Sequence, residues 1–335
     1  MRQSHIFRHN LKEVKPTDLN LAPLEGDLNR FEEILEKNIQ SDLPLMRDAA
    51  RHVVLAGGKR LRPALALACA YGVNGLEPTT DDVLKGACAI ELVHAGSLHH
   101  DDVIDNATTR RAIPSVNVQF TNTVAILSGD YLLSQASMLA ASLGADVSAL
   151  LAETISQLAI GQIIEQQNLF DARRTREQYL LAIEGKTASL FASACKIGAM
   201  VAGAETETVE ALHNYGYNIG MTFQIIDDLL DLTADEEVLG KPAGHDVTEG
   251  VYTLPVIFAA SNDARVKEVL GDHLTAAELD EVLVIAREPR FIDQTFSIAR
   301  DYGLRAAESL AYAQINAEVR DSFTRVIDGL LTRTF

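Results

Sequence analysis

Apolar residues recur every three or four positions along most of the chain, which is the spacing of amphipathic helices. Within residues 27–39, for example, the apolar positions are Leu28, Phe31, Ile34, Leu35 and Ile39. The same spacing fills long segments between breaks near residues 144–146, 170–171 and 203–204, and it predicts helices of about 25 residues there. No segment alternates apolar and polar residues over the length of a strand. The pattern therefore predicts an all-α helical bundle that needs no strand.

The organisation of the chain indicates one large domain. A chain of 335 residues suggests about two domains by length alone. No linker, fixed-period repeat or low-complexity tract divides it, so we predict a single helical domain over residues 21–335. Residues 1–20 are mixed and polar, and we expect a flexible N-terminal arm there.

Composition narrows the functional classes. The formal net charge of −18 and the pI near 4.9 argue against nucleic-acid binding, which needs a broad basic surface. Cys69, Cys88 and Cys195 lie in alanine-rich runs without metal-ligand spacing, as buried thiols of a reducing compartment do. We find no apolar run of the roughly 18–20 residues that cross a bilayer, and no apolar core of a secretory signal behind the charged start. These features predict a cytoplasmic protein.

Two groups of aspartates end apolar helical segments. The first group is Asp101, Asp102 and Asp105 in HHDDVID, and the second is Asp227, Asp228 and Asp231 in FQIIDDLLD. Aspartates at i and i+4 share one helix face, where like charges cost a few tenths of a kcal/mol and also oppose the helix dipole. A solvated acidic face would explain one such group. Two groups, each followed by basic residues, favour a pair of cation sites.

Basic residues gather near these aspartates. In AGGKRLRPAL, Lys59, Arg60 and Arg62 lie between a Gly-Gly turn and a helix N-terminus, which is a favourable place for a phosphate. Arg110 and Arg111 follow the first aspartates, Lys186 interrupts an apolar helix in EGKTA, and Lys241 lies in the loop after the second aspartates. The alternatives are an ordinary surface loop for the first group and, for Lys186, a side chain that extends to solvent.

Together these residues indicate chemistry on a diphosphate. Mg²⁺ commonly binds one or two carboxylates plus substrate phosphate oxygens, and basic side chains complete a site that stabilises a departing pyrophosphate. No Ser–His–Asp or Cys–His pattern, Walker-type GxxxxGK[ST] or GxGxxG is present. The apolar helices that precede each aspartate group would line a hydrophobic channel leading away from the metals.

Five motifs in order along the chain resemble those of the all-trans polyprenyl diphosphate synthases. They are GGKRLRP at 57–63, HHDDVID at 99–105, RR at 110–111, GKT at 185–187 and FQIIDDLLD at 223–231. The resemblance implies the isoprenoid synthase fold, with a central active-site cavity, and usually a homodimer. It also implies head-to-tail condensation, in which an allylic diphosphate ionises, isopentenyl diphosphate attacks the carbocation and a proton leaves.

The resemblance also assigns roles to individual residues. Up to three Mg²⁺ ions are implied, with Asp101 and Asp105 on two of them, Asp227 on the third, and Asp102, Asp228 and Asp231 beside these ligands. The implied isopentenyl diphosphate site is Lys59, Arg62, His94 and Arg111. The groups implied around the allylic diphosphate are Arg110, Lys186, Thr187, Gln224 and Lys241, of which the first four are the expected catalytic residues. Taken alone, His94 would be a hydrogen-bonded core histidine, and its place seven residues before Asp101 is what assigns it.

Five positions refine this expectation: two depart from the family's usual residues, and three bear on the length of the product. Val251 stands where the family more often has lysine, and Ala112 where glycine is usual, so we expect one contact to the allylic diphosphate to be absent. Gly96, Ser97 and Val93 precede Asp101 on one helix face, where bulky aromatics give this family short products. The absence of such aromatics predicts an open channel and a medium or long product, which would leave towards a membrane surface with at most peripheral contact. The function implied by the resemblance takes a farnesyl or geranylgeranyl primer. A short-chain synthase is the alternative.

Two other classes share the helical, metal-dependent character. A terpene cyclase or head-to-head condensing enzyme needs no isopentenyl diphosphate site, so GGKRLRP and Arg111 argue against it. A non-catalytic subunit of the same fold would be expected to lose the aspartates or the basic loop, and this chain keeps both.

Overall fold

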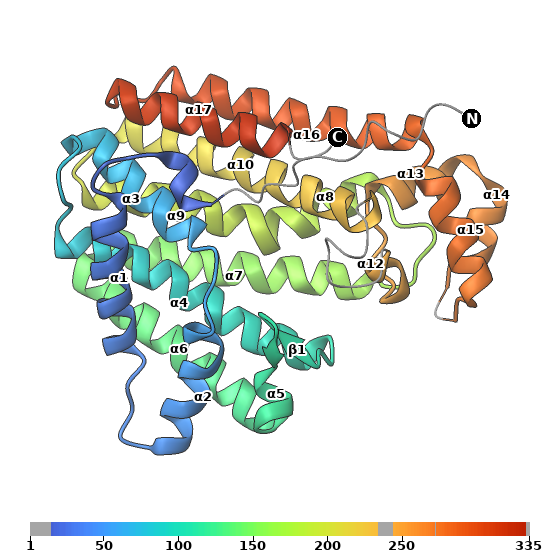
Figure 1. Cartoon of the computed structure of the whole chain (residues 1–335), viewed down its shortest axis with the longest axis horizontal. Coiled ribbons are helices and arrows are strands. Elements are labelled where there is room, and N and C mark those ends of the chain that lie inside the picture. Colours follow the sequence, from blue (N-terminus) through green and yellow to red (C-terminus); the bar gives the residue numbers. More distant parts are fainter. Residues whose placement is uncertain (1–14, 234–243, 272, 333–335) are drawn as a thin grey trace.

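A computed structural model describes residues 15–233, 244–271 and 273–332 of the chain, and helices dominate it (Figure 1). The first half contains η1 (Pro16–Leu19), α1 (Leu24–Asn38), α2 (Pro44–Leu55), α3 (Leu61–Asn74), α4 (Asp81–Ile104), α5 (Val116–Gln119), α6 (Asn122–Leu143) and α7 (Ala145–Gln167). The second half contains α8 (Arg176–Ile183), η2 (Glu184–Ala188), α9 (Ser189–Val201), α10 (Thr206–Thr233), α12 (His245–Thr248), α13 (Leu254–Asn262), α14 (Ala264–Val269), α15 (Ala276–Ala286), α16 (Pro289–Leu310) and α17 (Ala317–Thr332). The predicted all-α class is confirmed.

The expected helix breaks occur where glycine or a capping residue allows them. Helix α6 ends at Leu143 and α7 begins at Ala145, with Gly144 between them at φ 118°, a value that favours glycine. Helix α7 ends at Gln167, and Thr175 then caps α8 by accepting a hydrogen bond from the backbone N–H of Gln178. Local sequence is therefore enough to divide this part of the chain into its helices.

One short hairpin departs from the prediction that no strand is needed. Strand β1 (Thr109–Arg110) pairs antiparallel with β2 (Ile113–Pro114). The two residues that connect them, Arg111 and Ala112, both have positive φ (52° and 61°), as a type I′ hairpin turn requires. Strands of two residues are too short to show an alternating pattern, which explains why apolar spacing does not predict them.

The predicted flexible arm is wrong for residues 15–20. They include η1, and the side chain of Leu19 is fully buried. Its carbonyl accepts hydrogen bonds from Ser322 Oγ (2.6 Å) and Arg325 Nη2 (3.0 Å) of α17. This segment is thus held against the last helix of the bundle by contacts that a local reading cannot anticipate. Residues 1–14 lie outside the described part of the chain.

Two large clusters of buried side chains form the core. The first joins α1, α3, α4, α6, α9 and α17, and the second surrounds α13, α15 and the C-terminal half of α10. Helix α10 contributes Leu212 and Tyr215 to the first cluster and Ile225 and Leu229 to the second. In Figure 1 this helix runs beneath α16 and α17 along the bundle. The second aspartate group, near its C-terminal end, is therefore fixed by both clusters.

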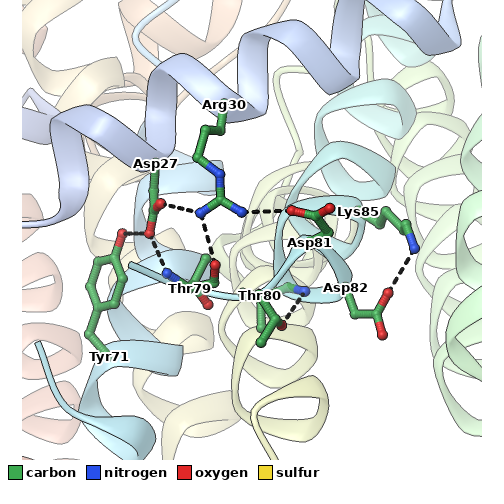
Figure 2. Close-up of polar contacts among 9 residues, drawn as sticks. Asp27, Arg30, Tyr71, Thr79, Thr80, Asp81, Asp82 and Lys85 are labelled. Atoms are coloured by element: carbon green, nitrogen blue, oxygen red, sulfur yellow. Dashed lines mark hydrogen bonds and ion pairs between the residues drawn. The ribbon is translucent and has the colours of Figure 1, made fainter. Parts of the chain in front are cut away.

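Helix α1 is held to the start of α4 by the buried carboxylate of Asp27, shown in Figure 2. Asp27 accepts hydrogen bonds from Tyr71 Oη (2.8 Å) and the backbone N–H of Thr79 (2.7 Å). Arg30 joins it to α4, with 2.7 Å to Asp27 and 2.6 Å to Asp81. The network fixes the N-terminal end of a 24-residue helix whose other end carries the first aspartate group.

Helices α6 and α7 correct one sequence-based expectation. By length and composition both are apolar enough to span a membrane, although we expected no such run. In α6, 39% of the relevant window is buried inside the structure, and in α7, 28%. The earlier expectation failed because scattered serine, threonine and glutamine residues interrupt these runs without adding charge.

Candidate active site

The first aspartate group ends α4 with two carboxylates on one face. Asp101 is half-buried and Asp105 is exposed, one turn further on. Burial raises the pKa of Asp101 to about 6, while Lys186 acts against that rise and Asp105 adds to it. Burial likewise raises the pKa of Asp105, again opposed by Lys186. Two carboxylates one turn apart, the first partly withdrawn from water and its charge disfavoured by the second, form a site suited to a cation.

Asp102 has a partner within the protein. Its carboxylate is fully buried, and Oδ1 accepts from Nε (2.8 Å) and Nη2 (2.6 Å) of Arg110 in strand β1. Asn117 Nδ2 also donates to the backbone carbonyl of Asp102 (3.1 Å). The contact holds the hairpin on α4, so the geometry favours the supporting role expected for Asp102. Its predicted part in metal binding stays a prediction.

The second aspartate group places its three carboxylates in different surroundings. Asp227 is exposed, whereas Asp228 and Asp231 are buried. Both oxygens of Asp228 accept hydrogen bonds, one from Tyr179 Oη (2.6 Å) and one from Gln224 Nε2 (2.7 Å). Burial raises the pKa of Asp228 well above its usual range. Asp227 is consequently the member of this group whose carboxylate is best exposed to an incoming cation.

Residues 184–188, which interrupt an apolar run in the sequence, form a π-helical turn between α8 and α9. Gly185 packs against α7 so closely that an added Cβ would lie 2.6 Å from the carbonyl oxygen of Gln157. The turn directs Lys186 to Glu165 of α7, with which it forms an ion pair. Burial opposes the charge of Lys186, yet Glu165 and the first aspartates raise its pKa. The lysine therefore faces the site and does not extend to solvent.

The same turn connects the two aspartate groups. Lys186 is electrostatically coupled to Asp101 and Asp105. Its neighbour Thr187 donates from Oγ1 to Gln224 Oε1 (2.7 Å), and Gln224 in turn bonds Asp228. The two aspartate groups thus flank η2. The predicted central cavity stays a prediction.

The residues predicted to bind isopentenyl diphosphate lie around the start of α3. Arg62 is half-buried, with its guanidinium 4.6 Å from the centre of the Phe191 ring. Gly58 lies against Arg111, and Lys59 is exposed beside them. Burial lowers the pKa of His94 well below its usual range, and Arg62 and Arg111 lower it further. The basic turn, the arginine pair and the histidine therefore come together although they are far apart in sequence.

The remaining predicted positions have mixed outcomes. Gly96 is buried at the crossing of α4 and α6, where an added Cβ would lie 3.0 Å from the carbonyl oxygen of Gly129. Its small size is explained by this crossing, so Gly96 alone does not indicate an open channel. Val93 is buried and Ser97 half-buried, so their effect on product length stays a prediction.

Val251 is half-buried and donates its backbone N–H to the Asp246 carbonyl (2.8 Å). Lys241 lies outside the described residues.

Sequence reasoning missed several partners of the site: Glu91, Glu165, Arg174 and Tyr179. Glu91 lies in the apolar run before the first aspartate group, and the other three lie outside every motif. Arg174 is buried, and its Nη1 donates to the Tyr252 carbonyl (3.0 Å). Only the packing of distant helices brings these residues to the motif residues, so no local signal identifies them.

Carboxylate oxygens are the donors that hard cations such as Mg²⁺ and Ca²⁺ prefer, and Asp101, Asp105 and Asp227 offer them. In residues 15–233, 244–271 and 273–332, no three histidine, cysteine or acidic side chains form a preassembled metal cluster. The arrangement fits divalent ions whose coordination is completed by a phosphorylated ligand. An all-helical chain with such carboxylates and a separate group of arginines belongs to the class of enzymes that act on diphosphates.

Comparison with known proteins identifies the family within this class. Residues 43–286 match the family model for polyprenyl synthetase. The nonaprenyl diphosphate synthase of Mycobacterium tuberculosis is 36% identical over 295 residues, which cover 87% of this chain and 88% of that protein. Component 2 of the heptaprenyl diphosphate synthase of Geobacillus stearothermophilus is 38% identical over 284 residues, covering 83% and 87% respectively.

A solved structure agrees with these relatives. The polyprenyl synthase of Caulobacter crescentus CB15, complexed with calcium and isoprenyl diphosphate, superimposes with a TM-score of 0.87 at 30% identity, covering 97% of this chain and 99% of that one. The chain belongs to the polyprenyl synthetase family. Its fold is the isoprenoid synthase fold, and it is a prenyltransferase, as the sequence motifs predicted.

Proposed function

We propose that the chain condenses isopentenyl diphosphate head-to-tail with an allylic diphosphate, farnesyl or geranylgeranyl diphosphate, to give a medium- or long-chain all-trans polyprenyl diphosphate. The observation that carries the proposal is the position of η2 between the two aspartate groups, with a separate arginine group at the start of α3. One diphosphate leaves during this reaction and the other is retained. Two distinct anion sites are therefore what the reaction needs.

Residues at η2 would serve the allylic diphosphate. Lys186 and Arg110 supply positive charge to the leaving group, and Asp101, Asp105 and Asp227 would hold Mg²⁺. When bound, the metal neutralises the charge that develops on the leaving diphosphate. The hydrogen bond from Thr187 fixes the orientation of the Gln224 amide. We propose that the oxygens of these two side chains stabilise the positive charge that develops on the allylic carbon as its C–O bond breaks. Attack by the isopentenyl double bond then forms a C–C bond, and a proton is lost.

The relatives support a medium or long product. They include a nonaprenyl and a heptaprenyl diphosphate synthase, which are named after medium or long products. A short-chain product of the same reaction is the alternative. Incubation with farnesyl diphosphate, radiolabelled isopentenyl diphosphate and Mg²⁺, followed by mass analysis, tests the proposal. We expect a product of several added isoprene units, and no product in excess EDTA. Failure to consume isopentenyl diphosphate, or full activity in EDTA, would refute the proposed function.

Mg²⁺ is proposed as the working ion, although the Caulobacter relative holds calcium. The support is chemical: Mg²⁺ keeps several waters and binds through one or two carboxylates plus substrate phosphates, a pattern that Asp101 and Asp105 fit. Activity titrations with Mg²⁺ and Ca²⁺ in parallel distinguish the two. Higher turnover with Ca²⁺ would contradict the proposal.

We propose further that the chain forms a homodimer through α6 and α7. Large apolar side chains are exposed on both helices: Ile126 (45%), Leu127 (51%), Met138 (58%), Ile160 (56%) and Ile163 (58%). Exposed apolar side chains that gather on two neighbouring helices favour a protein interface there. Light scattering should give twice the 36.4 kDa of one chain, and Met138→Glu should reduce it to one. A monomeric wild type would contradict this.

The need for a second, different subunit is tested by the activity of the chain alone. The Geobacillus relative is a component of its synthase, so a different second subunit is the alternative to the homodimer. Elongation by the purified chain would exclude that requirement.

The cytoplasm is the proposed compartment, supported by three free, buried cysteines and the acidic composition.

A further inference from the structure

A buried glutamate lies at the centre of the arginine group. Glu91 is on α4, 3% exposed and ten residues before Asp101. Its Oε1 lies 2.5 Å from Nη1 of Arg60 and 3.8 Å from Nη2 of Arg111. A carboxylate is seldom buried unless cations or hydrogen bonds compensate its charge. Here the compensating cations come from two segments, the start of α3 and the β1–β2 hairpin.

The C-terminus of α2 fixes the same two arginines from the other side. Arg60 Nη2 donates to the Val54 carbonyl (2.9 Å), and Arg111 Nη1 donates to the Val53 carbonyl (2.8 Å). Helix α2 ends at Leu55, so these carbonyls belong to its last turn, which has no helical partners and carries the negative end of the dipole. The two guanidinium groups are therefore held between a helix terminus and one buried carboxylate.

Arg62 and His94 complete the surroundings of Glu91. His94 follows Glu91 by three residues on α4, which places the two on the same helix face. Arg62 is electrostatically coupled to Glu91, which favours its charge, and to Arg111, which disfavours it. The Nε of Arg62 is buried and has no hydrogen-bond partner. Glu91 thus contacts two arginines, Arg60 and Arg111, and favours the charge of a third, Arg62.

We propose that Glu91 is a positioning residue for the isopentenyl diphosphate site. It holds the guanidinium group of Arg111 beside that of Arg60 and favours the charge of Arg62 before the substrate arrives, without touching the substrate itself. Three like charges in a partly buried site repel one another, so without Glu91 the substrate would have to gather them during binding. The inference rests on the proposed function, because it takes Arg62, Arg111 and His94 as the diphosphate site.

The sign of the effect separates positioning from simple charge. Glu91 is negative, so by charge alone it weakens the binding of a diphosphate, and its neutralisation would lower KM. If Glu91 acts by holding the arginines, its neutralisation raises KM. Glu91→Gln has nearly the same size and keeps an oxygen that accepts a hydrogen bond from Arg60.

The test is steady-state kinetics of Glu91→Gln with each substrate varied in turn. We expect KM for isopentenyl diphosphate to rise about tenfold, the value of one lost charge-assisted contact. KM for the allylic diphosphate and kcat should change less than about threefold, since η2 is a separate site. An unchanged or lower KM for isopentenyl diphosphate would overturn the proposal, as would an equal rise for both substrates.

Two variants serve as controls. Glu32→Gln removes the other carboxylate on Arg60, which lies 2.7 Å from Nε and is 43% exposed, and it should leave both KM values within about twofold because exposed ion pairs contribute little. Arg111→Gln tests the site itself. If Arg111→Gln leaves KM for isopentenyl diphosphate unchanged, the proposed site is wrong. If Arg111→Gln raises KM and Glu91→Gln does not, only the positioning role is wrong.

Folding is checked on the same samples by circular dichroism and thermal unfolding. Should Glu91→Gln fail to fold, the double variant Arg60→Gln with Glu91→Gln replaces the ion pair with two neutral amides that bond each other. In that background Arg111 and Arg62 still lack their carboxylate, so KM for isopentenyl diphosphate should remain raised about tenfold. A wild-type KM in the double variant would overturn the proposal.

Discussion

The hydroxyl of Tyr179 donates a 2.6 Å hydrogen bond to Oδ2 of Asp228, so this carboxylate of the DDLLD sequence is engaged by the protein itself. Gln224 holds the other oxygen at 2.7 Å and is in turn fixed by Thr187. Four side chains from α8, η2 and α10 therefore form one continuous chain of hydrogen bonds. The orientation of the Gln224 amide depends on a tyrosine that has no place in any motif.

Tyr179→Phe tests this dependence. The change removes one hydroxyl and leaves Oδ2 of the buried Asp228 without its donor, so we expect the free energy of unfolding to fall by about 1–3 kcal/mol. Urea unfolding measures it, and kcat should fall because Gln224 loses its fixed support. Tyr312→Phe, at a residue that is 66% exposed, is the matched control and should change neither quantity. Equal effects of both changes would contradict the relay.

The first aspartate group should divide into two roles. Asp101→Asn removes a half-buried charge that Asp105 disfavours, so the folded protein should be at least as stable as the wild type. Its turnover should fall by about a thousandfold or more, because a diphosphate-bound cation would lose a ligand. The helical circular dichroism spectrum should not change. Normal elongation by this variant would mean that the metal assignment is wrong.

Asp102→Asn should behave differently from Asp101→Asn. It breaks the ion pair between the buried Asp102 carboxylate and Arg110 and leaves that guanidinium without its carboxylate. Such a loss costs about 3–5 kcal/mol when both partners are deeply buried. Arg110 is 32% exposed, so we expect the lower end of this range or less. Thermal unfolding of the two variants side by side makes the comparison. Similar stability of both would contradict the distinction between them.

Much of the fold was accessible from the sequence because helices are local. The apolar spacing of residues 27–39 places α1, and Gly144 marks the boundary of α6 and α7, since φ 118° excludes most other residues. The site motifs were equally accessible, because Asp101 and Asp105 need only helical geometry to share a face. These predictions depend on neighbours within a few positions.

What could not be predicted depends on contacts between distant segments. Leu19 is fixed by Ser322, Lys186 by Glu165 and Arg111 by Glu91, and each pair is joined only when separate helices pack. For Gly96 the sequence-based interpretation was itself mistaken. Its small size was taken as a sign of an open channel, but the residue faces the backbone of Gly129. A single sequence does not tell whether a small residue faces a ligand or another helix.

Gly96 and Ser97 can be separated by experiment. An added Cβ at Gly96 would lie 3.0 Å from Gly129 O and 3.2 Å from Leu133 Cγ, so Gly96→Phe forces α4 and α6 apart. Overpacking of this kind costs about 1–3 kcal/mol or more, and thermal unfolding should reveal it. Ser97 is half-buried, and its hydroxyl donates to the His94 carbonyl of its own helix (2.9 Å). Ser97→Phe should therefore shorten the product with a smaller loss of stability. Equal destabilisation by both, with unchanged product length, would refute the channel.

The half-buried imidazole of His94 should make stability depend on pH. Burial, and then Arg62 and Arg111, lower its pKa in the folded protein well below the unfolded value of about 6.5. Below pH 6.5 the unfolded chain binds a proton that the folded protein refuses, so stability falls as the pH falls, by up to about 1.4 kcal/mol per pH unit for this one group. His94→Gln removes that contribution. Urea unfolding of both proteins at pH 7.5 and pH 5.5 should show a smaller loss of stability for the variant. Parallel losses would mean that His94 takes up a proton in the folded state, and that the arginines do not surround it as described.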